Sequence, residues 1–403
     1  MNILIYNLFL TIFLFLGAPI IFYSFRFDNI KRSYKFWIHC ASLGEVKMAL
    51  RLIEKIIKKF NLQPQDILLT ITTQTAKNYA KQFHKDTYIL PLDYYFITKN
   101  TIKKIKPQVL IILETELWPN LIYFANKFKS KIFLLNGRIS KRTFVFFKVF
   151  KFLFFNIINK IDYFLVREDV DFLRFKNLGI NKQKIKITGN MKYDDIEIDI
   201  NLNFTKKSFG FSEDDFIITF GSIREREEKE VLKVIRYFKH KDNIKFILAP
   251  RHLELLQKII FLLEKESIAY NFLSSQNFSS GYKCLVIDRY GQLNKLYFIS
   301  DIVFVCGSIL PYGGHNIIEP AILGKPVFFG PYISSFLEPA RILLKNNAAV
   351  QVKNMEEFIK KLEEIIGNTQ LILEYGRKAR AAMMKLKGVT EKNLDFIGQY
   401  IEV

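Results

Sequence analysis

The chain has 403 residues, and half of them are hydrophobic, which is enough apolar material for the cores of two domains. It carries 60 Lys and Arg against 39 Asp and Glu, a formal net charge of +21. This excess favours anionic partners such as nucleic acid, an acidic membrane surface or a phosphorylated substrate, although a general bias of composition explains it equally well. The three cysteines have no CxxC spacing and the five histidines no metal-ligand spacing, so neither a disulfide framework nor a zinc site is indicated.

The N-terminal segment, residues 1–25, contains no charged side chain and is long enough to cross the hydrocarbon core of a bilayer. We predict a membrane anchor here. Basic residues follow at positions 26–35, so the positive-inside rule places the rest of the chain on the cytoplasmic side. A cleaved signal peptide is the competing interpretation, but no basic residue precedes the apolar run and no cleavage site is evident. Pro19 leaves open a segment that dips into the bilayer without crossing it.

In the first half of the chain, short apolar runs alternate with helical patterns. The predicted strands are Phe36–Ala41, Ile67–Ile71, Tyr88–Leu92, Val109–Leu113, Lys131–Asn136 and Asp162–Val166. This alternation is typical of a parallel sheet with helices on both faces. The aromatic stretch 144–165 contains three lysines, which argues against a second membrane span. A helix at the lipid interface and a core helix with solvated lysines both remain open.

The pattern breaks near Thr188, and an acidic crossing follows at residues 194–199. We therefore predict a first α/β domain over 26–195 and a second over 196–403. The second half repeats the alternation, with predicted strands at Phe216–Phe220, Ile244–Ala249, Lys283–Ile287, Asp301–Val305 and Pro326–Phe329 and final helices at Met355–Ile366 and Leu371–Lys387. Two doubly wound domains that face a cleft place their ligand sites at the carboxyl ends of the strands.

The stretch Val303–Gly330 is the most suggestive of a binding site. A buried strand leads into a glycine-bearing turn, and a short helix follows with Asn316 as its N-cap, Glu319 in its first turn and Gly324 at its end. Glycines let a ligand approach the backbone, and the free N–H groups and dipole of a helix N-terminus favour an anion. An ordinary strand-to-helix connection explains the spacing equally well, because no GxGxxG or Walker pattern is present.

Carboxylates follow two predicted strands of the first half. Ser42-x-x-Glu45 has the spacing of a capping box, in which Glu45 only ties its own helix N-terminus. The functional alternative is a general base that takes a proton from a substrate hydroxyl. Glu114 and Glu116 come directly after another strand, where they are either cleft carboxylates or solvated loop charges.

Basic turns follow strands in both halves. Arg138 lies in the turn Asn136–Arg142, and Arg251 and His252 follow a strand of the second half. A guanidinium at such a position suits a phosphate or a carboxylate. The turn Gly221–Glu228 combines backbone N–H groups with charge in the same way. A solvated surface loop explains each turn when it is taken singly.

The motifs together resemble those of the Kdo transferases, membrane-associated glycosyltransferases that move 3-deoxy-D-manno-octulosonic acid (Kdo) from CMP-Kdo to a lipid A precursor. The similar segments are WIHCASLGEV, YILPLDYY, ILETELWPNLI, LLNGRISKRTF, ITGNMKYD, LAPRHLE, IDRYGQLNKLY and CGSILPYGGHNIIEPAILGKPVFFGP. They run from Trp37 to Pro331 in the family's order. Two turns depart from the family pattern: Ile223-Arg224-Glu225 stands where the family shows Thr-His-Glu, and Gln74-Thr75-Ala76 replaces a glycine-ended threonine motif.

The resemblance implies a GT-B fold with the acceptor in the N-terminal domain and the nucleotide sugar in the C-terminal domain. It implies that Glu45 is the catalytic base and that Glu319 lies near the ribose. The residues it implies for CMP-Kdo binding are Arg251, His252, Gly307, Ser308, Gly314, His315, Asn316 and Glu319. Those expected at the acceptor or in the cleft are Glu114, Glu116 and Arg138.

The expected reaction is an inverting transfer of Kdo to lipid IVA on the cytoplasmic face of the inner membrane, with a single-pass or monotopic anchor. The expected partners are CMP-Kdo, the phosphorylated lipid A precursor and the membrane surface, without nucleic acid. Neither a metal nor another cofactor is expected, because Arg251 and a helix N-terminus can stabilise the leaving phosphate. Two alternatives remain open: a GT-B transferase that uses a UDP-sugar on a lipid acceptor, and a non-catalytic basic protein that binds nucleic acid or anionic lipid.

Overall fold

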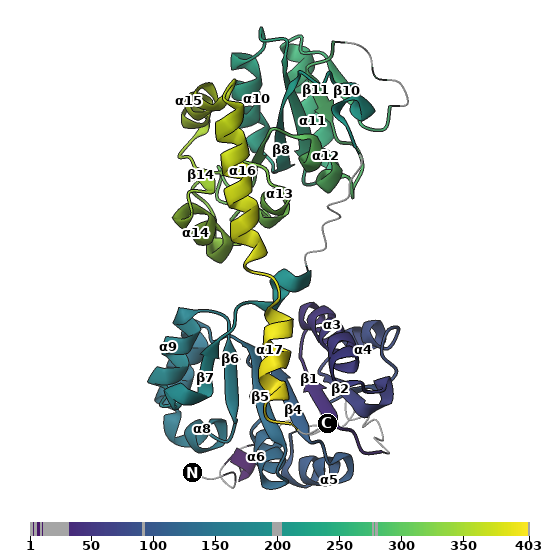
Figure 1. Cartoon of the computed structure of the whole chain (residues 1–403), viewed down its shortest axis with the longest axis vertical. Coiled ribbons are helices and arrows are strands. Elements are labelled where there is room, and N and C mark those ends of the chain that lie inside the picture. The colour runs from purple at the N-terminus through teal and green to yellow at the C-terminus, as the bar shows by residue number, and fades with distance from the viewer. Residues whose placement is uncertain are drawn as a thin grey trace. The chain divides into compact units, whose positions relative to one another are not determined.

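The computed structural model describes residues 3, 6–8, 10, 32–90, 93–195, 204–275, 278 and 281–401. The chain divides into two compact units, the first made of Met1–Asp195 with Leu386–Val403 and the second of Ile196–Lys385 (Figure 1). Among the described residues, no helix combines the length and the apolar character needed to cross a bilayer. Most of the predicted anchor at residues 1–25 lies outside the described residues.

The first unit is built on a seven-stranded sheet in the order β3-β2-β1-β4-β5-β6-β7, and neighbouring strands pair in parallel. Its strands are β1 (Phe36–His39), β2 (Ile67–Ile71), β3 (Thr87–Ile89), β4 (Val109–Leu113), β5 (Lys131–Gly137), β6 (Tyr163–Val166) and β7 (Ile185–Ile187). Side chains alternate between the faces: Phe36 and Ile38 join one buried cluster, and Trp37 joins the other. Both faces are therefore covered, as predicted for a doubly wound unit.

The helices of the first unit follow the strands along the chain. They are α3 (Leu43–Phe60), α4 (Gln74–Ala80), α5 (Tyr95–Ile105), α6 (Pro119–Lys127), α7 (Lys141–Val149), α8 (Lys151–Ile158), α9 (Asp169–Asn177) and the C-terminal α17 (Val389–Gly398). The aromatic stretch 144–165 therefore divides among α7, α8 and β6. Val145, Phe146 and Val149 are exposed, whereas Ile157 and Ile158 are buried, so only part of this stretch belongs to the core.

The second unit repeats the architecture with a seven-stranded sheet in the order β10-β11-β9-β8-β12-β13-β14, again parallel throughout. Its strands are β8 (Phe216–Ile223), β9 (Ile244–Pro250), β10 (Tyr270–Phe272), β11 (Cys284–Val286), β12 (Ile302–Val305), β13 (Val327–Phe329) and β14 (Ala349–Gln351). Its helices are α10 (Glu227–Tyr237), α11 (Leu256–Lys265), α12 (Leu293–Ile299), α13 (Ile318–Ile322), α14 (Leu337–Lys345), α15 (Met355–Ile365) and α16 (Thr369–Met384).

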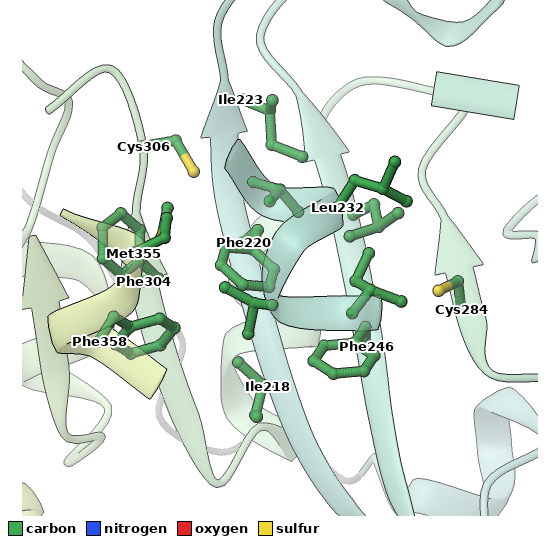
Figure 2. Packing of buried hydrophobic residues seen from close by; sticks show 14 of the residues in the cluster. Ile218, Phe220, Ile223, Leu232, Phe246, Cys284, Phe304, Cys306, Met355 and Phe358 are labelled. Carbon is green, nitrogen blue, oxygen red and sulfur yellow. The ribbon is translucent and has the colours of Figure 1, made fainter. Parts of the chain in front are cut away.

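A cluster of aromatic side chains holds the second unit together. Phe220 of β8 packs between Phe246 of β9 and Phe304 of β12, and Phe358 of α15 contacts both Phe220 and Phe304 (Figure 2). All of these rings are fully buried. Since aromatic side chains bury large apolar areas, this cluster fixes the strands whose carboxyl ends carry the site described below.

Two sequence predictions are wrong in detail. The prediction that residues 196–403 form one domain fails at the C-terminus, because α17 buries Val389, Leu394 and Ile397 in the core of the first unit (Figure 1). The predicted last helix also ends at Met384, before this return. The strands β7, β10 and β14 were not predicted, because each is a three-residue strand at a sheet edge and is too short to show a period.

Candidate active site

Glu45 lies in the first turn of α3, directly after β1. Its Oε2 accepts a hydrogen bond from the backbone N–H of Ala41 at 2.9 Å, and its Oε1 accepts one from the Ser42 hydroxyl at 2.7 Å. The Ser42 side chain does not cap the helix backbone, so the reciprocal capping box does not form. The carboxylate is turned back toward the end of β1, where the helix dipole favours a negative charge, and the residue is only 7% exposed.

Two more carboxylates come from the loop after β4. Glu114 has a left-handed backbone (φ 56°) and pairs with Lys192 Nζ at 2.7 Å. Glu116 accepts a hydrogen bond from Trp118 Nε1 at 3.2 Å. Burial raises the pKa of Glu116, and the charges of Glu45 and Glu114 raise it further. The three acids therefore lie within electrostatic reach of one another at the carboxyl edge of the sheet.

The turn after β5 borders the same edge. Arg138 is exposed, and its backbone carbonyl accepts a hydrogen bond from the Thr115 hydroxyl. Asn136, also in a left-handed conformation (φ 54°), accepts a hydrogen bond from the backbone N–H of Met191. These hydrogen bonds join the turn after β5 to the loop after β4 and to the segment around Met191. Arg138 therefore belongs to the same region as Glu114 and Glu116.

His39 is a residue of this region that sequence reasoning missed. It ends β1, is fully buried, and its Nδ1 lies 3.0 Å from the Thr70 hydroxyl. Its ring meets Trp118 edge-on, and its Nε2 is buried without a hydrogen-bond partner. Burial lowers the pKa of His39 to about 4. The imidazole is therefore neutral at physiological pH. A polar residue at the end of an apolar strand is the sequence signal that could have identified it.

In the second unit, the turn after β12 is shaped by a buried carboxylate, Glu227, at the start of α10. Its Oε2 accepts from the N–H groups of Gly307 at 2.6 Å and Arg224 at 3.1 Å, and its Oε1 accepts from those of Ile309 and Leu310. Glu227 is fully buried. Sequence reasoning named the turn Gly221–Glu228 but not this residue, because the contacts span about a fifth of the chain.

The predicted glycines of this turn have left-handed backbones, Gly307 at φ 74° and Gly314 at φ 79°. The N–H of Gly314 donates to the carbonyl of Gly307 at 2.6 Å. A Cβ on Gly314 would lie 1.9 Å from the Phe336 ring, and one on Gly307 would lie 2.8 Å from His315. Both positions therefore require glycine. Ser308 is fully buried, and its hydroxyl donates to the Val305 carbonyl and accepts from the Gly330 N–H, so its side chain is engaged within the protein.

The short helix α13 begins later than predicted. Ile317 already has a helical backbone (φ −87°, ψ −10°) and takes the N-cap position, so the prediction of Asn316 as N-cap is wrong. The Asn316 side chain still accepts from the Ile318 N–H, and its amide donates to Glu319 Oε1 at 2.9 Å. Asn316 thereby orients Glu319. Burial raises the pKa of Glu319, whereas Asn316 and the charge of Arg251 act in the opposite direction.

Basic side chains gather beside these residues. Arg251 and His252 are exposed after β9, and the guanidinium of Arg224, after β8, lies 2.9 Å from His252 Nε2. The pKa of His315 is lowered to about 4, first by burial and then by the charges of Arg251, Arg224 and His252. These groups thus lie close together at the carboxyl ends of β8, β9 and β12. A hollow of about 260 Å³ adjoins them, lined by Ile223, Glu225, His252, Glu254, Leu255 and Lys258.

Comparisons with known proteins give the family and the fold. Residues 22–195 match the family model described as 3-deoxy-D-manno-octulosonic-acid transferase (kdotransferase). The whole chain resembles a glycosyltransferase from Rickettsia africae, with a TM-score of 0.55 at 16% identity over 90% of this chain and 97% of that one. It also resembles the UDP-GlcNAc 2-epimerase of Neisseria meningitidis, with a TM-score of 0.57 at 12% identity over 90% and 99% of the two chains.

The two doubly wound units form a GT-B-like fold, and the match to the transferase family model makes the chain a glycosyltransferase. More specifically, the chain belongs to the 3-deoxy-D-manno-octulosonic acid (Kdo) transferase family, as its 30% identity to a member over 93% of this chain and the family model together show.

Three relatives indicate the extent of the similarity. The chain is 30% identical to the 3-deoxy-D-manno-octulosonic acid transferase of Chlamydia muridarum, over 93% of this chain and 92% of that protein. It is 29% identical to the Haemophilus influenzae enzyme of the same name, over 91% and 87%. It is 35% identical to a bifunctional glycosyltransferase/methyltransferase of Fusobacterium nucleatum, over 84% of this chain but 54% of that protein, so it spans about half the length of this relative.

Proposed function

We propose that the protein transfers Kdo from CMP-Kdo to lipid IVA, the phosphorylated lipid A precursor, with inversion at the anomeric carbon. The observation that carries this proposal is the geometry of Glu45, a carboxylate held at the end of β1 by Ala41 and Ser42. In the proposed step, Glu45 takes the proton of an acceptor hydroxyl as that oxygen attacks the anomeric carbon. The bond from this carbon to the phosphate oxygen breaks, and CMP leaves with the electron pair.

The donor site is proposed at the turn after β12. A CMP phosphate would lie against the backbone of the glycine turn, beside Arg251 and His315. Glu319, oriented by Asn316, suits the hydroxyl groups of a ribose because a carboxylate accepts hydrogen bonds only. The guanidinium of Arg251 and the backbone N–H groups of the turn supply the charge stabilisation that a departing phosphate needs, so we propose that the reaction requires no divalent metal.

The acceptor site is proposed in the first unit, near Glu45. Arg138 and Lys192 carry positive charge at the same edge of the sheet, which suits the phosphates of a lipid A precursor. The exposed apolar face of α7, flanked by Lys148 and Arg142, suits the interface of an anionic membrane. We accordingly propose residence on the cytoplasmic face of the inner membrane, held there also by an anchor within residues 1–25.

The test is mass spectrometry of the products when detergent-purified protein meets CMP-Kdo and lipid IVA in the presence of EDTA. We expect a mass gain of one or more Kdo units, and no gain with UDP-sugars. Glu45→Gln should reduce the rate by about 10²- to 10⁴-fold, while CMP still protects the variant against thermal unfolding. Glu54→Gln, an exposed position on the same helix, is the matched control and should remain active. Near-normal turnover by Glu45→Gln would refute the assignment of the base.

A further inference from the structure

Arg224 and Arg251 of the second unit place two guanidinium groups at one edge of its sheet. Among the described residues of this unit, Arg236 pairs with Glu266, whereas neither Arg224 nor Arg251 forms an ion pair. Both lie at the carboxyl ends of adjacent strands, β8 and β9, which pair in parallel up to Ile223 and Pro250. The charges of both arginines act on His315, and like charges in one region repel each other, so a bound anion stabilises them.

Arg224 is held in place on three sides. Its backbone N–H donates to Glu227, the carboxylate that also shapes the glycine turn. Its guanidinium stacks over the Tyr312 ring at 4.8 Å and lies 2.9 Å from His252 Nε2. Because a guanidinium can only donate, His252 accepts this hydrogen bond through Nε2. Tyr312 is itself fixed, since its hydroxyl donates to the Glu225 carbonyl at 3.0 Å.

This arrangement leaves most of the guanidinium available to a ligand. A guanidinium has five N–H donors in a planar fork, and one of its nitrogens contacts His252. The side chain also approaches the glycine turn, because a Cβ placed on Gly307 would lie 3.4 Å from Arg224 Cγ. Arg224 therefore lies beside the backbone where the proposed donor binds. Because its side chain is already held in place, it loses little conformational entropy when it forms further hydrogen bonds there.

We propose that Arg224 is a donor-binding residue that contacts the phosphate of a cytidine nucleotide together with Arg251. The inference rests on the proposed function and extends it to a residue of the turn after β8. Two guanidinium groups match the charge of a phosphate, which carries about two negative charges when CMP departs as a monoester. Arg224 thus acts on binding of the donor and on stabilisation of the leaving group, and not on the acceptor.

The test measures the affinities of CMP and of cytidine for the full-length protein in detergent by calorimetry. Because Arg224 contacts only the phosphate, Arg224→Gln should weaken CMP binding by about 10- to 100-fold and leave cytidine binding nearly unchanged. The CMP affinity of Arg224→Lys should lie between those of the wild type and Arg224→Gln, because lysine retains the charge but lacks the planar fork of N–H donors. Arg226→Gln, an exposed position in the same turn, is the matched control and should bind CMP as the wild type does. Kinetically, KM for CMP-Kdo should rise in Arg224→Gln while KM for the lipid stays constant.

The outcomes separate this inference from the proposed function. Unchanged CMP affinity in Arg224→Gln would overturn the role of Arg224 and leave the proposed donor intact. An equal loss of CMP and cytidine binding would also overturn it, because the side chain would then only support the turn. A wild-type protein that binds neither CMP nor CMP-Kdo would overturn both proposals.

Discussion

At the scale of single residues, buried carboxylates organise both sites. Both carboxylate oxygens of Glu227 accept hydrogen bonds from backbone N–H groups of two separate turns. Burial raises the pKa of Glu227, and the four donors counteract that rise. Glu45 instead uses local contacts within its own turn. Glu227 is therefore a positioning group, whereas Glu45 lies at the edge of the sheet where a substrate can contact it.

Glu227→Gln should lower the stability of the second unit, because the substitution removes acceptors of backbone hydrogen bonds as well as a charge. A glutamine presents an N–H₂ group to backbone donors, so at least one buried N–H loses its acceptor, at a cost of about 1–3 kcal/mol each. We expect urea unfolding to show a loss of this order and CMP affinity to fall with it. Glu228→Gln is the control, because this neighbouring buried acid has an Oε2 without a hydrogen-bond partner. Wild-type stability and CMP affinity in Glu227→Gln would contradict the positioning role.

At the scale of elements, α7 combines features that a core helix does not have. Val145, Phe146 and Val149 are exposed, and Lys141, Arg142 and Lys148 are exposed on the same helix. No acidic residue occurs between Glu116 and Asp162. The apolar side chains of such a face can enter the interface of a bilayer, and the basic side chains beside them are attracted to anionic lipid headgroups. We expect α7 to strengthen membrane association in addition to the N-terminal segment.

The double variant Phe146→Ser, Val149→Ser should weaken binding to anionic vesicles, measured by co-sedimentation, and keep activity on detergent-solubilised substrates. The matched control is Val170→Ser, Leu173→Ser, which removes two exposed apolar side chains from α9. If both double variants bound vesicles as the wild type does, the proposed role of α7 would be wrong.

At the scale of the whole molecule, each unit contains a histidine that folding keeps neutral. Burial lowers the pKa of His39 in the first unit, and mainly burial lowers that of His315 in the second, in each case to about 4. In the unfolded chain these groups take up protons near pH 6.5. The folded state therefore keeps its full stability from these groups above pH 6.5 and loses it as the pH falls toward 4.

We expect acid to destabilise the protein through His39 by up to about 3 kcal/mol between pH 6.5 and 4, since this side chain is fully buried. Urea unfolding at pH 7.5, 5.5 and 4.5 measures the loss, and His39→Asn should reduce its slope. Asp93 acts in the opposite direction, because burial raises its pKa to about 6. Its contribution to the stability of the folded protein is lost as the pH rises through 6 and regained as the pH falls. Asp93→Asn should therefore steepen the acid loss. An identical pH dependence in wild type and His39→Asn would exclude this origin.

The sequence by itself determined that each half of the chain forms a parallel sheet covered by helices, but not the short edge strands β7, β10 and β14. Strands such as β2 and β4 are buried along their whole length, and a strand covered on both faces must be a continuous apolar run, which is visible in one dimension. The glycines at 307 and 314 could be singled out in the same way, because a tight turn after a strand needs backbone angles that other residues avoid. The family motifs follow these strand ends, so the candidate residues could be named from the sequence.

Only the tertiary structure decided how these residues are held. Asp194 accepts hydrogen bonds from the N–H groups of Gly388, Val389 and Thr390, which returns α17 to the first unit across almost half of the chain. The contacts of Glu227 with the glycine turn and of Arg224 with His252 and Tyr312 also join residues that are far apart in the sequence, although over shorter separations. Such partners have no local pattern, because parallel sheets bring the ends of strands together only after the helices between them have packed.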